Sequence, residues 1–335
     1  MERIYKPGEL TKMAKALYQE ERNIKRLDGW FLAKETEMIF EEKYADCSDE
    51  VKKAYLLCEI LKNIPLSLSE NAVFVGTQRD AFARSYALIH PSFTVQGFSG
   101  YCDPMAVYHD IEPNKAFTKE RIDRVRAHTA KTSMVKKLSK TYAAAEHYTK
   151  EVIFFVEQVT GHVIPDFRYA LKYGIDAVIE QANSKHGDFY KAAAIALSGV
   201  KILIHRYLIL INEQKQHCSA GRRVQLAFLE ATLKKISCKG ADCLYEALQL
   251  YLLLWMVMCL EQAPNPYAFS VGNADRIFEP YRNDLTREEA SELFRHFLVF
   301  YNVGDRSWAI SQNVLLGGRD LDGNDLSNTM TYAIM

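Results

Sequence analysis

The chain has 335 residues, of which 48% are hydrophobic and 25% are charged. Those proportions are typical of a globular protein that buries a sizeable core. The 42 Lys and Arg residues balance the 42 Asp and Glu residues, so the formal net charge is zero. Without a basic excess, we expect neither nucleic acid nor a membrane as a partner. Near-neutral charge also leaves little repulsion between copies and permits self-association.

Cysteine usage and the first residues of the chain bear on its compartment. Seven cysteines are scattered along the sequence without a CxxC pair, and the opening residues MERIYK lack the apolar core of a signal peptide. Both features indicate reduced thiols in a cytoplasmic protein, with no zinc site. The longest apolar run, residues 250–260, is shorter than the ~20 residues that a membrane span needs. It predicts a helix buried in protein.

The N-terminal part of the sequence predicts helices with a strand and a loop among them. Residues 9–25 and 31–46 carry mixed charge at helical spacing, and apolar residues of 51–63 fall on one helix face. Residues 72–76, AVFVG, form a short β-branched run that predicts a buried strand. Proline and glycine punctuate residues 85–119, which predicts a packed irregular loop. Cys102 lies in this loop and is interpreted as a structural thiol.

The rest of the chain is predicted to be mostly helical. Long helical patterns cover residues 119–158, 165–183, 187–214, 221–236, 241–262 and 286–301. Two further runs, residues 267–271 and 308–316, are predicted strands. Pro165 fits the first turn of its helix, and Thr286 fits an N-cap position. Because no repeat, low-complexity tract or flexible linker interrupts the pattern, we expect a single domain over residues 1–335.

The first motif surrounds His162. Residues 160–174 read TGHVIPDFRYALKYG, which places His162 in a loop that enters a helix. An imidazole at this position could face a pocket, and a helix N-terminus offers free N–H groups to a polar ligand. The alternative is that His162 satisfies a loop carbonyl and has no chemical role.

The second motif contains a predicted strand. Residues 261–281 read EQAPNPYAFSVGNADRIFEPY. Because successive strand residues point to opposite faces, Phe269 and Ser270 should face different sides. Both are candidates to line a pocket, and the alternative for Phe269 is ordinary core packing.

The third motif ends the chain. Residues 312–335 read QNVLLGGRDLDGNDLSNTMTYAIM. Gly317 and Gly318 let the backbone turn sharply where a strand ends, and Asp325 is a suitable N-cap for a helix that begins at Leu326. The stretch from Asp320 begins like an EF-hand loop. It lacks the glycine and the glutamate that such a loop needs at its sixth and twelfth positions, so calcium is not expected.

Together these three motifs resemble, in order and spacing, the first half of the glycyl radical enzymes, the pyruvate formate-lyase-like superfamily. The resemblance is closest to the dehydratase and C–X lyase branches. Those enzymes carry similar Gly-His-x-x-Pro-Asp, Gly-Arg-x-Asp-Gln and Leu-Gly-Gly motifs. In the second motif this chain departs from the family, since Asn273 replaces the usual arginine and Arg276 replaces the usual glutamine.

The resemblance implies an α/β fold, the ten-stranded α/β barrel of this family, wrapped in helices. This chain would supply a mainly helical part with a few barrel strands. The resemblance also implies a small-molecule cavity that His162, Phe269 and Ser270 line. In the family a separate activating enzyme, which uses an iron–sulfur cluster and S-adenosylmethionine, installs a radical on a glycine. That radical passes to a cysteine on another loop.

Both radical-bearing loops fall beyond Met335 in the resemblance. We therefore expect no catalytic residue, no cofactor-binding residue and no metal ligand here, and no activity from the chain alone. Residues 1–335 would be the N-terminal portion of an anaerobic glycyl radical dehydratase, lyase or formate acetyltransferase-like enzyme. A complementary C-terminal chain, as in a split enzyme, or a second copy would be its partner. The alternative is a non-catalytic binding or scaffold protein, and the substrate stays open among diols, amino-alcohols, hydroxyproline and sulfonates.

Overall fold

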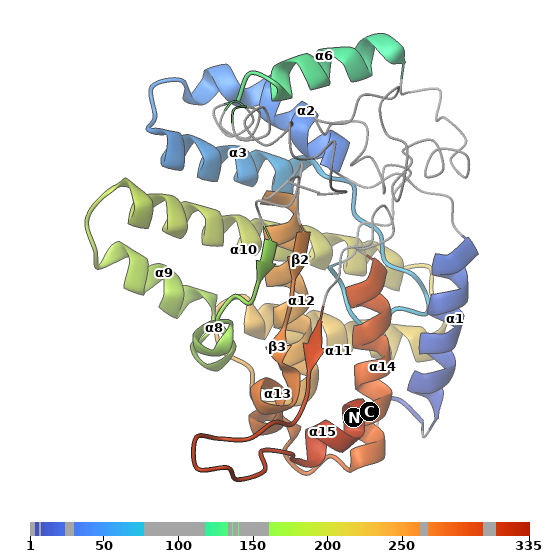
Figure 1. Cartoon of the computed structure of the whole chain (residues 1–335). Helices are drawn as coiled ribbons and strands as arrows, with labels where there is room; N and C mark the ends of the chain where they lie inside the picture. Colours follow the sequence, from blue (N-terminus) through green and yellow to red (C-terminus); the bar gives the residue numbers. More distant parts are fainter. Residues whose placement is uncertain are drawn as a thin grey trace, which may run out of the picture.

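The computed structural model describes residues 4–6, 8–23, 30–76, 118–132, 136, 140, 161–261, 267–303 and 313–335. Cys102 and most of the irregular segment predicted around it lie outside these ranges. So do most of residues 133–160, the second part of the helix predicted over residues 119–158. Within the described ranges, helices dominate and the strands are short (Figure 1).

The helices are α1 (Glu9–Asn23), α2 (Trp30–Phe40), the 3-10 helix η1 (Glu41–Tyr44), α3 (Asp49–Asn63), α6 (Lys119–Thr129), α8 (Arg168–Tyr173), α9 (Ile175–Asn183), α10 (Asp188–Lys215), α11 (Ala220–Ile236), α12 (Leu244–Glu261), α13 (Ala274–Arg282), α14 (Arg287–Val303) and α15 (Thr329–Ile334). The strands are β1 (Gly161–Val163), β2 (Tyr267–Phe269), β3 (Gly272–Asn273) and β4 (Val314–Leu315). The prediction of a mainly helical segment with a few strands is confirmed.

Helix α12 lies at the centre of the core. It contacts α10, α11, α13, α14 and β2, and aromatic side chains of α13 and α14 pack around Tyr251. By length and composition alone, α10 and α12 could each cross a membrane, but 78% of the apolar window of α12 is buried inside the fold. The apolar run at residues 250–260 is therefore a core helix, as predicted.

The prediction of a single helix over residues 165–183 is wrong. Pro165 precedes the helical region, and Gly174, at φ +90°, divides it into α8 and α9. The break follows from a close approach of two backbones: a Cβ on Gly174 would lie 2.5 Å from the carbonyl carbon of Lys239. The amide of Ala241 also donates to the carbonyl oxygen of Leu171 over 2.8 Å. Contact with residues 239–241 therefore ends α8.

The prediction of a strand at residues 72–76 is also wrong, although the segment is fully buried. Within the described part of the chain, its backbone bonds mostly to side chains and pairs with no strand. The amide of Gln249 accepts from Val75 N over 2.9 Å and donates to Val75 O over 2.8 Å. Tyr245 donates to the carbonyl of Val73, and Arg222 donates to that of Ala72 over 3.0 Å. Helices α11 and α12 thus supply the bonds that a neighbouring strand would have made.

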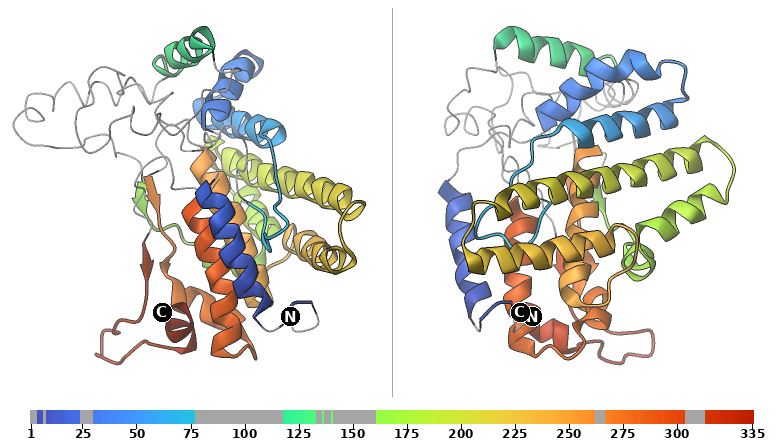
Figure 2. Two further views of the ribbon diagram at one scale, coloured as in Figure 1. Left: turned by 90° about the vertical axis from the view of Figure 1, so that its right-hand side faces the viewer. Right: turned by 180° about the vertical axis from the view of Figure 1, so that it is seen from behind.

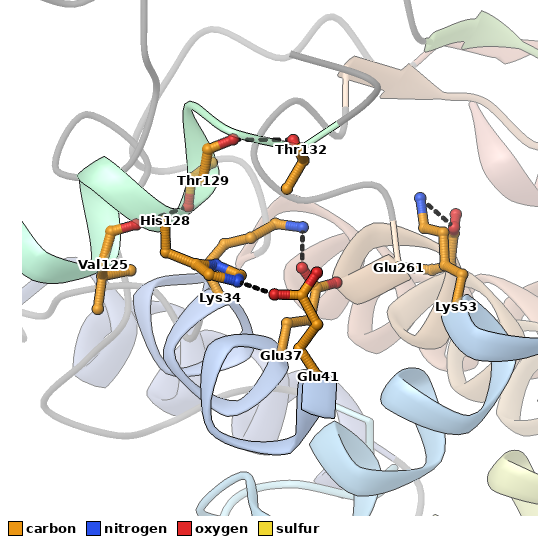
Figure 3. Close-up of polar contacts among 9 residues, drawn as sticks. All are labelled: Lys34, Glu37, Glu41, Lys53, Val125, His128, Thr129, Thr132 and Glu261. Atoms are coloured by element: carbon orange, nitrogen blue, oxygen red, sulfur yellow. Dashed lines mark hydrogen bonds and ion pairs between the residues drawn. The ribbon is translucent and has the colours of Figure 1, made fainter. Parts of the chain in front are cut away.

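Polar contacts hold α6 against the N-terminal helices. His128 Nε2 lies 2.6 Å from a carboxylate oxygen of Glu41, and Figure 3 shows the imidazole of α6 turned towards that carboxylate. Arg121 on α6 donates to Glu35 on α2 over 2.6 Å. On the other side of α3, Lys53 pairs with Glu261 at the end of α12, over 2.7 Å. These contacts connect the N-terminal helices to each other and to the core helix.

Candidate functional site

The four strands form two parallel pairs. β1 pairs with β2, with Val163 opposite Phe269, and β3 pairs with β4, with Gly272 opposite Val314. Residues 270–271 join β2 to β3, so the two pairs lie end to end. Figure 1 shows β1 and β4 on opposite sides of this joined segment. The junction between β2 and β3 is the place where all four strands approach one another.

Two side chains of the helical layer bind the carbonyl oxygen of Phe269 at the end of β2. Trp255 Nε1, from α12, donates over 3.1 Å, and the Tyr301 hydroxyl, from α14, donates over 2.8 Å. Burial raises the pKa of Tyr301 well above its ordinary value, which keeps the hydroxyl protonated as a donor. The Phe269 side chain is 4% exposed and packs in the hydrophobic core. The strand is therefore anchored to the helices at this residue.

Ser270, directly after β2, connects the two strand pairs. Its backbone N–H donates to Val163 O over 3.0 Å, towards β1. Its Oγ accepts from the backbone N–H of Asn313 over 2.9 Å, at the start of β4. The Phe269 carbonyl oxygen accepts from Trp255 and Tyr301 of the helices. The N–H of Asn313 therefore bonds to the Ser270 hydroxyl, where a strand carbonyl would otherwise be its acceptor. This buried serine is thus part of the strand framework.

Gly272 is required where β3 begins. Its φ of +78° is a conformation that L-residues avoid. A Cβ at this position would also lie 2.7 Å from Cγ2 of Ile164, the residue after β1. Both conditions exclude a side chain, so β1 and β3 approach each other closely beside the junction.

Asp275, in the first turn of α13, organises the end of the chain. It is fully buried, and its Oδ2 accepts from Gly317 N and from Thr331 Oγ1, each over 2.6 Å. Gly317 and Gly318 have φ values of +62° and +104°, which confirms the sharp turn predicted from the double glycine. One carboxylate therefore holds both the turn after β4 and helix α15.

The predicted N-cap at Asp325 is wrong. Helix α15 begins at Thr329 and is capped by Asn328, whose side chain accepts from Thr331 N over 3.0 Å. Asp325 accepts instead from Ser327 N over 2.9 Å, and in the preceding loop Asp320 accepts from Asn324 N over 2.8 Å. Aspartate side chains in this polar loop thus bind backbone groups of the loop itself. Among the residues that the structure describes, no group of three or more His, Cys, Asp or Glu side chains could hold a metal ion.

One buried thiol and one cavity lie among the helices of the described ranges. The Cys58 thiol donates to Ile195 O over 3.3 Å, and burial raises its pKa, so it stays protonated. A cavity of about 300 Å³ lies between the end of α10 and the start of α11 and is lined in part by Arg222, Glu70 and Glu213. The Arg222 guanidinium binds backbone carbonyls of the segment before residue 76, which is a structural role.

The structure places the three predicted site residues at the strand junction. His162 is the middle residue of β1, between the two register positions that pair β1 with β2. Phe269 ends β2 with its side chain in the core, and Ser270 bridges to the start of β4. The two neighbours thus have different surroundings. A role in binding substrate stays a prediction for all three residues.

Sequence comparison assigns this chain to a family. The family model described as pyruvate formate lyase-like matches residues 1–335. The chain belongs to the pyruvate formate lyase-like family. One curated relative, the (2S)-3-sulfopropanediol dehydratase of Klebsiella oxytoca, is 25% identical to this chain over 207 residues. That match covers 52% of this chain and 25% of the dehydratase.

Solved structures of glycyl radical enzymes share the fold. The glycerol-bound B12-independent glycerol dehydratase from Clostridium butyricum matches with a TM-score of 0.75 and 19% identity, over 96% of this chain and 45% of that one. A glycyl radical enzyme from Archaeoglobus fulgidus matches with a TM-score of 0.72 and 18% identity, over the same shares. The expected barrel fold class is confirmed. This pyruvate formate lyase-like chain spans less than half the length of these structures.

Sequence reasoning missed the residues that anchor the strands. Trp255 lies within an apolar helical run, and Tyr301 lies at the end of another helix, so neither carries a local signal of its role. Asn313 contributes a backbone N–H, which no side-chain pattern reveals. Asp275 lies at the aspartate of the Gly-Arg-x-Asp-Gln pattern in the second motif, so the sequence carried a signal for this position.

Proposed function

We propose that this chain supplies the N-terminal part of the barrel of a glycyl radical dehydratase or C–X lyase and, with it, part of a substrate cavity. The observation that carries the proposal is the strand junction, where His162, Phe269 and Ser270 come together within a chain of this family. Proteins similar to this chain are dehydratases of glycerol, 1,2-propanediol, trans-4-hydroxy-L-proline and (2S)-3-sulfopropanediol. By extension, we propose that the substrate of this chain is a small hydroxylated molecule that loses water.

The residue types at the junction suit such a substrate. Small-molecule cavities are mostly apolar and contain a few placed polar groups. Ser270 is a neutral polar group held by two backbone contacts, and it lies beside the apolar core that contains Phe269. An imidazole at His162 adds a group that can accept or donate a hydrogen bond. These residues would orient the substrate hydroxyl groups and exclude water.

We further propose that catalysis also needs the radical-bearing cysteine and glycine loops of the family, on which the activating enzyme would act. Exposed apolar side chains on the outer strands support the need for further strands: Val163 is 43% exposed, Ile164 55% and Leu315 45%. Uncovered strand edges of this kind favour pairing with other strands. The complete enzyme would work in an anaerobic cytoplasm.

The test is reconstitution. This chain, a polypeptide that carries the cysteine and glycine loops, and an active radical activating enzyme are produced together under anaerobic conditions. We expect a glycyl radical signal by electron paramagnetic resonance, and loss of a diol substrate only when this chain is present. A radical signal with diol turnover that is the same without this chain would contradict the proposal.

The alternative is a binding protein without radical chemistry, and two residues favour it. Asn273 occupies the N-cap of α13 without a side-chain bond to the helix, and the Arg276 side chain donates to the carbonyl oxygen of Gly317 over a long 3.5 Å. Isothermal titration of the chain alone with glycerol or 1,2-propanediol separates the two functions. Binding by the isolated chain that Ser270→Ala weakens, together with no radical signal on reconstitution, would establish the alternative.

A further inference from the structure

A cavity with charged walls lies where α10 meets α11. Its volume of about 300 Å³ is at the lower end of the ~300–1,000 Å³ range of small-molecule pockets. In the view from behind in Figure 2, a short turn joins α10 to α11 beside α1. The end of α10, this turn, the first turn of α11 and the segment that follows α3 all contribute to the walls. These residues are different from those of the strand junction.

Arg222, in the first turn of α11, is a buried cation on the wall of this cavity. The residue is only 9% exposed. Its Nη groups donate to the carbonyl oxygens of Ser69 and Ala72 and to the side-chain oxygen of Gln225. These acceptors are neutral, and within the described ranges no carboxylate oxygen lies within 4.0 Å of the guanidinium. Because a guanidinium stays charged, the fold buries a positive charge without an ion-pair partner.

One donor of this guanidinium also has no acceptor. Nε of Arg222 is buried and makes no hydrogen bond to the part of the chain that the structure describes. A buried donor without an acceptor is unfavourable, and more so on a charged group. Burial also lowers the pKa of Arg222, which is the direction expected for a cation removed from water. An anion in the adjoining cavity would supply both the acceptor and the negative charge.

The sequence adds positive charge at the same point. Residues 220–223, at the start of α11, read AGRR and include no acid. A helix N-terminus is the positive end of the helix dipole, where acidic side chains are favoured and arginines are not. Ser219 caps this end by accepting from Arg222 N over 3.2 Å. The reversed charge preference is the pattern expected beside a bound anion.

Negative charge lies on other parts of the wall. Glu70 and Glu213 both line the cavity, are exposed, and have no side-chain partner among the described residues. His217 and Cys218 also line it, but no group of three or more His, Cys, Asp or Glu in the described ranges could hold a metal ion. The two carboxylates therefore suit an organic cation.

We propose that this cavity binds a free α-amino acid with an aliphatic side chain. The carboxylate of the amino acid accepts from Arg222 Nε, and its ammonium group lies towards Glu70 and Glu213. Leu210, which packs against the hydrophobic core, provides an apolar wall for the ligand side chain. The site does not depend on the strand junction or on the proposed function.

A zwitterion suits the cavity better than an ion of either sign. A carboxylate alone would meet repulsion from Glu70 and Glu213. An amine alone would leave the charge of Arg222 unpaired. An amino acid carries both groups on one carbon atom, so it can place each beside a wall of opposite charge.

Titration calorimetry of the 335-residue chain with three compounds of similar shape tests the site. L-Valine carries both charges, isovalerate lacks the ammonium group, and isobutylamine lacks the carboxylate. In a buffer without carboxylate or phosphate, we expect L-valine to bind roughly fivefold more tightly than either analogue, because each analogue loses one charged contact. Absence of L-valine binding at millimolar concentration, or equal affinities for L-valine and isovalerate, would overturn the proposal.

Substitution of one carboxylate on the wall should change the affinities of two ligands in opposite directions. Glu213→Gln removes an attraction for the ammonium group and a repulsion of a lone carboxylate. It should weaken L-valine binding about threefold and strengthen isovalerate binding by a similar factor. A change of both affinities in the same direction would contradict the assigned role. Glu180→Gln, at an exposed position of α9, is the matched control and should change neither affinity.

Cys218 reports whether the cavity is occupied. It is a half-buried free thiol on the wall, whereas Cys238 is an exposed free thiol that does not line the cavity. L-Valine should slow the alkylation of Cys218 by iodoacetamide and leave that of Cys238 unchanged, as measured by mass spectrometry of peptides. Equal rates for Cys218 with and without L-valine would count against the site.

Arg222→Lys keeps the charge but removes the donor at Nε. It should abolish the binding of both L-valine and isovalerate, and retained binding of either would contradict the role of Nε. Because the substitution also removes bonds to Ser69 and Ala72, circular dichroism must show that the variant is folded. If it does not fold, the opposite shifts expected for Glu213→Gln decide the matter.

Discussion

The carboxylate of Asp275 lies 2.6 Å from the hydroxyl of Thr331, which joins the first turn of α13 to the last helix of the chain. The same oxygen receives the amide of Gly317, in the turn after β4. Asp275 is fully buried, so water cannot replace these partners. The C-terminal block thus depends on one side chain, and its loss should be measurable.

Asp275→Ala should lower the free energy of unfolding by about 3 kcal/mol, because it leaves the buried N–H of Gly317 without its acceptor and removes the nearer acceptor of the Thr331 hydroxyl. Urea denaturation followed by circular dichroism measures this change. Asp322→Ala removes an exposed aspartate from the neighbouring loop and should change stability by less than about 0.5 kcal/mol. Equal effects of the two substitutions on the free energy of unfolding would show that the Asp275 contacts do not stabilise the fold.

Gly272→Ala should destabilise the fold by about 3 kcal/mol, since the new methyl group combines an unfavourable φ with a clash against Ile164. Gly323→Ala is the matched control. Its φ is +85° but nothing lies within 4 Å of the added Cβ, so backbone strain alone, about 1 kcal/mol, should appear. Combining Gly272→Ala with Ile164→Ala should recover part of the loss. No recovery in the double variant would mean that the clash is not the cause.

Gln249→Leu should cost about 3 kcal/mol, because the buried amide satisfies both the N–H and the carbonyl of Val75. The substitution keeps the volume similar and removes both bonds. Gln181→Leu, on an exposed face of α9, is the control for the chemical change itself. Denaturant unfolding of both variants provides the comparison, and equal small effects would argue against the bonds to Val75.

Stability should rise with pH between about 4 and 6.5 because of His296. Burial lowers the pKa of His296 from 6.5 to about 4, while Nε2–H donates to Leu10 O over 2.8 Å. The unfolded chain therefore binds more protons than the folded chain across this window, and stability falls as the pH falls. The loss from this group reaches about 3 kcal/mol at pH 4.

The variant His296→Gln tests this pH dependence. A glutamine amide can still donate to the Leu10 carbonyl but does not titrate, so the difference in unfolding free energy between wild type and variant should change across the window. Unfolding at several pH values between 4 and 7 measures it. A difference that is constant with pH would contradict the assignment to His296.

Much of the helical architecture could be predicted because it depends on local periodicity. Helices α10, α11 and α12 have bounds within three residues of the predicted ones. The capping contact of Thr286 with Glu289 N at the start of α14 follows from residues adjacent in sequence. The three motifs likewise indicated the family, and they located the region where His162, Phe269 and Ser270 meet.

The errors arise where distant segments compete with local preference. The apolar pattern of residues 72–76 is typical of a strand, but the partner that satisfies Val75 is Gln249, 174 residues further along. The pattern of residues 165–183 is helical throughout, but Gly174 must turn because residues 239–241 press against it. No short stretch of sequence reveals these contacts between distant residues.

The amino-acid order therefore specified which segments are helical, which face of each is apolar and which family the chain joins, since these properties arise within a few residues. Folding in three dimensions settled where β2 is anchored, by Trp255 and Tyr301, and why Ser270 connects two strand pairs. Burial and backbone pairing are relations between remote residues, so only the packed structure defines them.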